Sequence, residues 1–274
     1  MKGIFYIDGQ NVSQQYGFVL SEGSYVSLLA YPPLKEPEMN SWAEYSGIEV
    51  DLSAPKLDAV TRRLRLCSFR PVYDLQGFIG LLQSKGKSDF TFPDLGITQT
   101  LRYVGCTGID VGDVLECELE FCEDEPLKGF TFQAPIAGNT PNQGLQLDGV
   151  DISVYNLQLL DGTASSVLKP SMIKPGLLIT SRGITGQKSS MVPLYTQSRD
   201  VTLKLFMKCA GMNLFVRNYY SLLHKLIQPG ERELVYGLYD QSLKFFYKYS
   251  AINYFSNDGS VWCEFDVNVC ITNG

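Results

Sequence analysis

Ile7-Asp8-Gly9-Gln10-Asn11-Val12-Ser13 stands near the start of the chain, and Leu147-Asp148-Gly149-Val150-Asp151-Ile152-Ser153 repeats its pattern at an offset of 140. Both segments read apolar-Asp-Gly-x-(Asn or Asp)-apolar-Ser. An Asp-Gly pair favours a tight turn between strands, because Gly adopts a positive φ without strain and Asp tolerates one. We therefore predict that two related units each open on a strand, an Asp-Gly turn and a second strand.

Further elements follow in the same order after each turn. Residues 60–66 and 201–207 are candidate strands, the second with clean alternation of apolar and polar residues. Apolar residues then recur with helical i, i+3, i+4, i+7 spacing, at Leu75, Phe78, Ile79 and Leu82 and again at Val216, Tyr219, Tyr220 and Leu223. Aromatic strands come next, and each half closes on a strand ending in Cys, at residues 115–122 and 263–270, an offset of 148.

This order predicts an α+β, β-rich fold of two similar antiparallel-sheet domains, each like a split β-barrel with one packed helix and a long extended arm. We place the first domain at residues 1–124, a linker at 125–144 and the second domain at 145–274. The Gly, Pro and Asn residues of the linker favour a loop. Phe130 and Phe132, near its start, are candidates for a short additional strand.

Each half has a long insertion between its Asp-Gly turn and its central strand. The first contains Tyr31, Pro32, Pro33 and Trp42, which we expect to make contacts. The second is predicted to be a long hairpin whose glycine-bearing tip, the proposed assembly arm, comprises Arg182, Gly183, Ile184, Thr185 and Gly186. Long excursions in compact domains are usually functional or disordered. Their apolar flanks favour arms that pack on another surface; the alternative is an arm folded back on its own domain.

Charge is unevenly distributed along the 274 residues, whose net charge is −6. Residues 1–124 hold 10 basic and 18 acidic residues, whereas residues 125–274 hold 13 and 11. Opposite bias suits head-to-tail docking, although drift on solvated surfaces explains it equally well. An acidic chain is a poor binder of nucleic acid, so no sequence-specific nucleic acid partner is expected. The N-terminal residues lack the apolar core of a signal peptide, and no apolar run reaches the length of a membrane span.

No recognisable catalytic, cofactor or metal site emerges. The seven Cys residues lack zinc-ligand spacing, and His224 is the only histidine, more typical of a partly exposed helix residue than of a base. The segment 171–174 fits Ser-x-x-Lys, but the companion motifs of penicillin-recognising enzymes are missing. The densest basic cluster is Arg62, Arg63, Arg65 and Arg70. We expect its aliphatic stems to cover a sheet face or its guanidinium groups to pair with neighbouring acids.

Each half resembles the N-terminal domain of distal tail proteins and the related tail-tube proteins of long-tailed phages. The resemblance rests on the Asp-Gly-x-(Asn or Asp)-(Val or Ile)-Ser opening, the long arm, a strand with Val-Thr, a helix with a Leu-Leu pair and the closing strand ending in Cys. It covers nearly the whole chain, taken twice. Distal tail proteins usually follow this domain with a galectin-like one, whereas here a second copy follows.

The resemblance implies a structural subunit of a phage or prophage tail, a distal-tail, baseplate or tail-tube-like component, and not an enzyme. It implies self-association into a ring, as a trimer of duplicated subunits or a hexamer, with other tail proteins as partners, no cofactor, and assembly in the bacterial host cytoplasm into the virion tail. Two other classes stay open: a non-catalytic carbohydrate- or peptide-binding module with Tyr-rich sheet faces, and an enzyme whose site has no recognisable motif.

Overall fold

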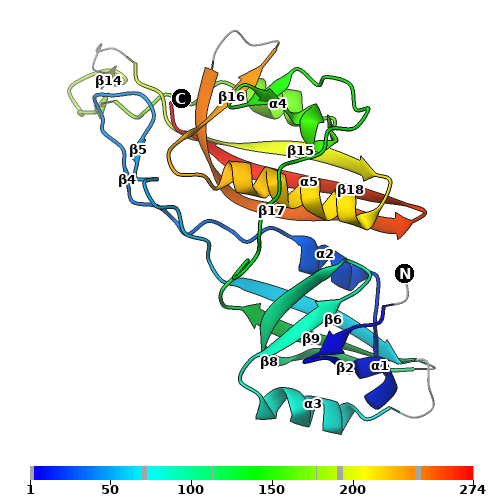
Figure 1. Cartoon of the computed structure of the whole chain (residues 1–274). Coiled ribbons are helices and arrows are strands. Elements are labelled where there is room, and N and C mark those ends of the chain that lie inside the picture. Colours follow the sequence, from blue (N-terminus) through cyan, green and yellow to red (C-terminus); the bar gives the residue numbers. More distant parts are fainter. Residues whose placement is uncertain are drawn as a thin grey trace.

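A computed structural model of the chain describes residues 3–68, 73–112, 114–176, 178–189, 194–237 and 242–273. These residues form two large antiparallel sheets of seven strands each and two small two-stranded hairpins. Figure 1 shows one large sheet above the other, with a short helix between them and a longer helix against the upper sheet. The predicted α+β, β-rich class is confirmed.

The two large sheets have the same strand order. The first runs β2 (Gln10–Asn11), β1 (Tyr6–Ile7), β7 (Ser88–Phe92), β8 (Ile97–Val111), β9 (Leu115–Glu123), β6 (Val60–Ser68) and β3 (Val19–Leu20). The second runs β11 (Val150–Asp151), β10 (Leu145–Leu147), β16 (Arg232–Tyr236), β17 (Ser242–Asp258), β18 (Ser260–Ile271), β15 (Arg199–Cys209) and β12 (Leu157–Leu159). Strand for strand, the topology of the N-terminal half (residues 1–124) recurs in the C-terminal half (residues 145–274), whose boundaries stay a prediction.

The helices also occupy matching places in the two halves. The described helices are α1 (Val12–Gln15), α2 (Gly23–Leu29), α3 (Leu75–Ser84), η1 (Ile152–Tyr155), α4 (Thr163–Leu168) and α5 (Met212–Leu226). The sequence predicts α3 and α5. It does not predict the short helices α2 and α4, which dock alike: the hydroxyl of Ser24 bridges the N–H and C=O of Arg65, and that of Thr163 bridges those of Lys204.

Both Asp-Gly pairs form turns of one kind. Asp8 and Asp148 have φ of 50° and 47°, and each is followed by a glycine at positive φ. The Asp8 carboxylate accepts the N–H of Asp89, and the Asp148 carboxylate accepts that of Glu233. A lysine pairs with each carboxylate, Lys85 in one half and Lys225 in the other. The hydrogen bond from Lys85 is the main cause that lowers the pKa of Asp8.

Strand register confirms the predicted match of the closing strands and corrects that of the central strands. Arg65 in β6 and Lys204 in β15 are equivalent, because each bonds the matching hydroxyl of α2 or α4, so residues 60–66 match 199–205 and not 201–207. Arg65 pairs with Glu118 and Lys204 pairs with Asp266, so the closing strands match at the predicted offset of 148. The sequence alignment of the central strands was two positions out, since a shift of two positions keeps every side chain on the same face.

A continuous apolar core joins the halves. Tyr25 on α2 lies 6.1 Å from Phe255 on β17, and Tyr31 lies 4.2 Å from Tyr219 on α5, measured between ring centroids. The linker adds to this core, because Phe130 packs on Tyr220. Residues 124–144, all of them described, contain no strand, so the optional strand at Phe130 and Phe132 is wrong. Their rings pack on α5 instead.

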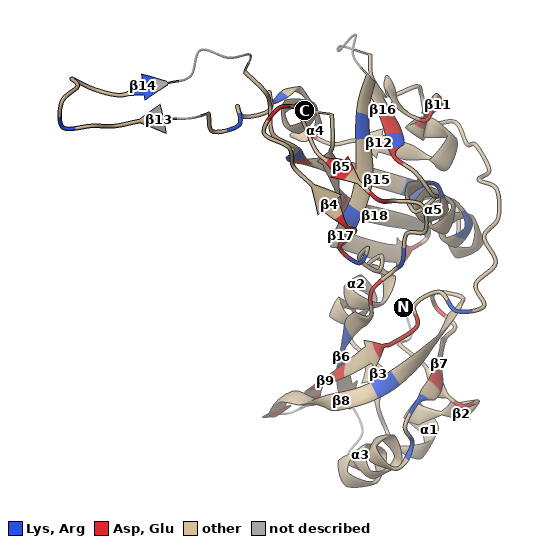
Figure 2. Ribbon diagram, turned by 90° about the vertical axis from the view of Figure 1, so that its left-hand side faces the viewer, with Lys and Arg blue, Asp and Glu red and all other residues tan. Residues whose placement is uncertain are grey.

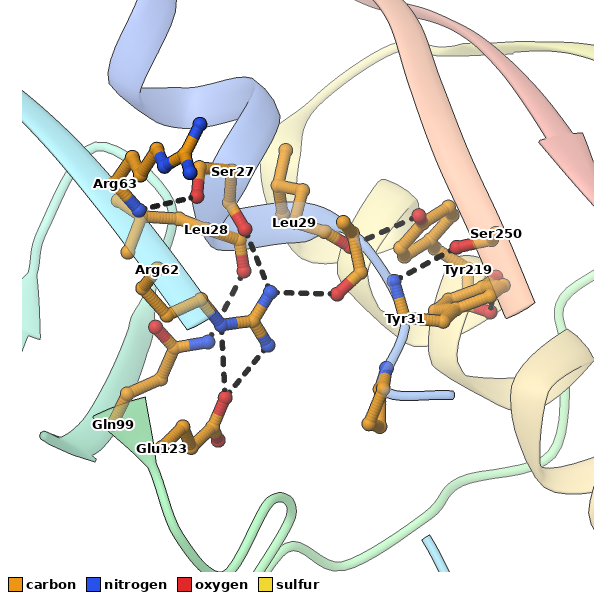
Figure 3. A network of polar contacts seen from close by, with 12 residues as sticks. Ser27, Leu28, Leu29, Tyr31, Arg62, Arg63, Gln99, Glu123, Tyr219 and Ser250 are labelled. Atoms are coloured by element: carbon orange, nitrogen blue, oxygen red, sulfur yellow. Dashed lines mark hydrogen bonds and ion pairs between the residues drawn. The ribbon is translucent and has the colours of Figure 1, made fainter. Parts of the chain in front are cut away.

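Arg62 ties α2 to the first sheet (Figure 3). Its side chain is buried and donates to the Glu123 carboxylate at 2.6 Å from Nη2 and 3.0 Å from Nε. Its Nη1 donates to the carbonyls of Ser27 and Ala30 at the end of α2. The predicted basic cluster thus has a structural role here, and Arg63 and Arg65 pair with Glu120 and Glu118 on β9. Arg70 lies outside the described residues.

We expect Arg62→Ala to lower the free energy of unfolding by about 3–5 kcal/mol, because removing one partner leaves the Glu123 carboxylate buried without its countercharge. Arg63→Ala is the matched control. Arg63 is 65% exposed and should change stability by at most about 1 kcal/mol. Urea unfolding of both variants, followed by fluorescence, measures the difference, and equal losses would contradict the assigned role of Arg62.

Candidate functional site

Two arms of one design leave the two halves. Arm 1 (residues 30–59) contains the hairpin β4 (Met39–Asn40) and β5 (Glu49–Val50) and a bridge between Leu34 and Leu57. Arm 2 (residues 169–198) contains the hairpin β13 (Leu178–Ile179) and β14 (Lys188–Ser189) and a bridge between Ile173 and Thr196. Each of these features recurs at a constant offset of 139, so the arms correspond position by position.

Arm 1 is seated on the C-terminal half of its own chain. Its backbone bonds run from Leu34 N to Lys248 O at 2.8 Å, from Gly47 N to Thr196 O at 2.8 Å and from Ile48 N to Thr272 O at 2.9 Å. Gly47 has a φ of +75°, and a Cβ there would lie 1.8 Å from the Thr272 carbonyl oxygen. Only glycine therefore allows this approach.

Apolar side chains complete the seat of arm 1. Leu52 is buried against Phe246 and Cys270, and Leu34, Ile48 and Val50 pack around them. Tyr31 and Pro32 are buried at the root of the arm, where Tyr31 donates to the Tyr219 carbonyl and Tyr247 donates to that of Pro32 at 3.0 Å. Of the other predicted contact residues, Pro33 is half-buried and Trp42 is 50% exposed.

Arm 2 has no such seat within the described residues. Figure 2 shows its hairpin projecting away from both sheets. Arg182, Gly183, Thr185 and Gly186 are exposed and Ile184 is half-buried. Gly186, the counterpart of Gly47, keeps a φ of +80° although a Cβ there would meet nothing within 4 Å. The backbone shape that seats arm 1 is thus present in arm 2 without an occupied seat.

Large apolar side chains are exposed along arm 2 and at its root. Met172 is 70% exposed, Ile173 53% and Leu168, the last residue of α4, 36%. Ile179 and Leu194 are exposed too. At the root of arm 1, Leu29, which corresponds to Leu168, is fully buried. Exposed apolar surface of this kind is typical of an interaction site.

The tip of arm 1 touches the root of arm 2. Lys174 donates to the carbonyls of Trp42 and Gly47 at 2.7 Å each, and the N–H of Thr196 donates to the Ser46 hydroxyl at 3.1 Å. Lys174 belongs to the Ser-x-x-Lys segment, so its ammonium group holds arm 1 in this structure. The sequence prediction missed Lys174 and Ser46. Aligning the two arms at the offset of 139 would have shown that Lys35 and Thr185 match them.

A second exposed apolar patch lies at the end of the β8–β9 ribbon. Val104, Ile109 and Val111 are each at least half exposed. The corresponding end of the β17–β18 ribbon is covered, because Phe255 packs against Tyr25 of α2 and Asn257 donates to the Asp94 carbonyl. Val111 pairs with Leu115 as Phe255 pairs with Cys263, and Leu115 matches Cys263 at the offset of 148, so Val111 is the counterpart of Phe255.

Chemical groups outside the arms have structural settings. Burial raises the pKa of Cys117 to about 12 and that of Cys270 to about 11, so neither thiol ionises appreciably near neutral pH. His224 lies in the last turn of α5 and stacks on Phe132 at 4.4 Å. Among the described residues, no group of three or more His, Cys, Asp and Glu side chains is placed to hold a metal ion. In the same residues, no helix is both long and apolar enough to cross a membrane.

Comparison with known proteins gives a likeness in structure and none in sequence. No protein-family model matches the sequence, and no curated protein matches it. Among solved structures, the chain is similar to the crystal structure of the SPP1 Dit protein, described as "a Paradigm of Hub Adsorption Apparatus in Gram-positive Infecting Phages". The sequences are 12% identical, 98% of each chain is covered, and the TM-score is 0.34. At that TM-score the likeness supports no inference about the function of this chain.

Gly47→Ala should unseat arm 1, since the added Cβ collides with the Thr272 carbonyl as well as straining a positive φ. Gly186→Ala is the matched control, because it has the same φ strain, about 1–2 kcal/mol, without the collision. The Gly230 amide also reports on the seat, because it donates to the Leu52 carbonyl at 2.8 Å. In dilute solution, hydrogen exchange at the Ile48 and Gly230 amides should accelerate strongly only in Gly47→Ala. Equal protection in both variants would contradict the seat.

Proposed function

We propose that this protein is a structural subunit of a phage or prophage tail, a distal-tail, baseplate or tail-tube-like component that acts by self-assembly. Two lines support the proposal: the sequence resemblance of each half to the N-terminal domain of distal tail and tail-tube proteins, and the arrangement of the arms. Its partners would be further copies of itself, in a ring of three duplicated subunits or of six, and other tail proteins. Its location would be the virion tail.

One observation carries the proposal: two arms of the same build, of which one is seated and the other is exposed. Arm 1 shows that this design binds a neighbouring sheet-and-helix half through backbone hydrogen bonds and apolar packing. Arm 2 presents an equivalent hairpin and exposed apolar side chains. A protein whose purpose was to bind a small molecule would gain nothing from exposing this surface, whereas an assembly subunit needs it.

Deleting residues 181–188 from arm 2 should abolish higher-order assembly and leave thermal stability nearly unchanged, because the hairpin tip makes few contacts with its own chain. The measurements are sedimentation velocity across a concentration series and negative-stain microscopy, in which rings or tubes are expected for the unaltered protein.

The matched control removes residues 42–49, the equivalent tip of arm 1. This deletion should lower stability, since it takes away Gly47, Ile48 and their bonds to Thr196 and Thr272. Unchanged assembly after loss of residues 181–188 would contradict the role of arm 2. A monomeric parent protein that binds an oligosaccharide or a peptide would contradict the assembly function as a whole.

A further inference from the structure

We propose that the contact between the halves of one chain is the template for the contact between copies: arm 2 of one molecule seats on the N-terminal half of a second copy. This inference rests on the proposed function and specifies the partner and the surface. The residues that make the seat of arm 1 have counterparts, at the offset of 139 within the arms, on the surfaces that would form the seat of arm 2.

The polar anchors recur. Within the chain, Lys174 donates to the carbonyls of Trp42 and Gly47, and Ser46 accepts the N–H of Thr196. The counterpart of Lys174 is Lys35, an exposed lysine at the root of arm 1. In the proposed contact, Lys35 of one copy donates to the carbonyls of Ser181 and Gly186 of the other.

The remaining anchors at the arm tip follow the same rule. Thr185 replaces Ser46 and keeps the hydroxyl that accepts a backbone N–H. Leu57 replaces Thr196, so its N–H would donate to Thr185 and its carbonyl would accept from the N–H of Gly186. Gly186 already has the positive φ that Gly47 uses in its seat. Gly186, Thr185 and Lys35 are thus available for the roles that Gly47, Ser46 and Lys174 have within the chain.

Charge favours this occupant. Arm 1 holds 2 basic and 6 acidic residues, whereas arm 2 holds 4 basic residues and no acidic one. The N-terminal half without arm 1 holds 8 basic and 12 acidic residues. A basic arm therefore meets an acidic body, which steers association and disfavours the wrong pairing of like charges.

Side-chain character at the seat changes in step on both sides. Arm 1 presents Ile48 to a seat that includes Cys270. By the strand offset of 148, Cys122 takes the place of Cys270 in the N-terminal half, and Asp124 takes that of Thr272, whose carbonyl accepts from Ile48. Hydrogen bonds from Arg102 first, and from Lys87 next, lower the pKa of Asp124, so its carboxylate is ionised. On arm 2 the counterpart of Ile48 is Gln187, which is followed by Lys188. Arm 1 thus meets its seat through apolar side chains, whereas arm 2 is polar and basic and its proposed seat is acidic.

The exposed ribbon gains a partner in the same contact. Within the chain, Phe255 of the β17–β18 ribbon packs under Tyr25 of α2. Its counterpart Val111 is 70% exposed. In the proposed contact Val111 of one copy lies under α4 of the other, where Ala164 replaces Tyr25 and the exposed Leu168 replaces Leu29. Two exposed apolar patches are thereby covered by one another.

Cysteine cross-linking tests the seat. In a background with exposed Cys106 changed to Ser, Thr185→Cys and Leu57→Cys are introduced in separate copies, which are then mixed and mildly oxidised. We expect a reducible dimer whose cross-linked peptides join positions 57 and 185. Ser46→Cys with Thr196→Cys in one chain is the positive control, because these positions are in contact within the chain and should yield a cross-linked monomer.

Lys35→Ala provides a second readout. It should weaken self-association on the order of tenfold, since it removes hydrogen bonds from a charged donor. Lys56→Ala, a change at another exposed lysine of arm 1 with no place in the contact, should leave association unchanged. If the parent protein assembles but positions 57 and 185 do not cross-link, the seat is wrong and the assembly function survives. If the parent protein stays monomeric at high concentration, both fall.

Discussion

The seating of arm 1 on the C-terminal half is the constraint on which the rest of the structure depends. Without it the halves would be joined chiefly through the linker, α2 and the hydrogen bond from Asn257 to the Asp94 carbonyl. With it, the Tyr31 ring enters the core of the second half, and Gly47 lies against the Thr272 carbonyl. Several of the arm's carbonyl and amide groups are satisfied by a neighbouring sheet and not by water, so a long excursion becomes part of a continuous core. The two halves therefore behave as an assembled pair within one chain.

Much of the fold could be predicted from the sequence, because the signals are local. The Asp-Gly turns are detectable through their φ requirements, and α3 and α5 through apolar spacing. The short helices α2 and α4 could not be predicted, since so few residues show too little periodicity. Their docking depends on hydrogen bonds from the hydroxyls of Ser24 and Thr163 to an adjacent strand. The length of the strands could not be predicted either. Strand β8 extends to Val111 because bulges let a mostly exposed ribbon continue beyond the core.

The candidate site was only partly predictable. Arms with apolar flanks could be identified, but the place where arm 1 seats depends on contacts between residues far apart in the chain, such as Leu34 with Lys248. Buried Asn218 shows the same limit. This residue is not part of the predicted apolar stripe, yet its amide accepts from and donates to the backbone of Ile136 because the linker covers that side of α5.

Duplication explains why one arm is seated and the other is not. A lone unit with an exposed arm and an uncovered ribbon must find both partners in other molecules. When two such units are joined, arm 1 and the β17–β18 ribbon find their partners within the chain. The β8–β9 ribbon and arm 2 remain exposed. Those leftovers lie on different halves, so they are complementary and not self-complementary. A contact of that kind is heterologous: it closes into a ring if the rotation permits and otherwise continues as a filament. The basic character of arm 2 then has a physical consequence in the proposed contact, because it attracts arm 2 to the acidic N-terminal half of a second copy.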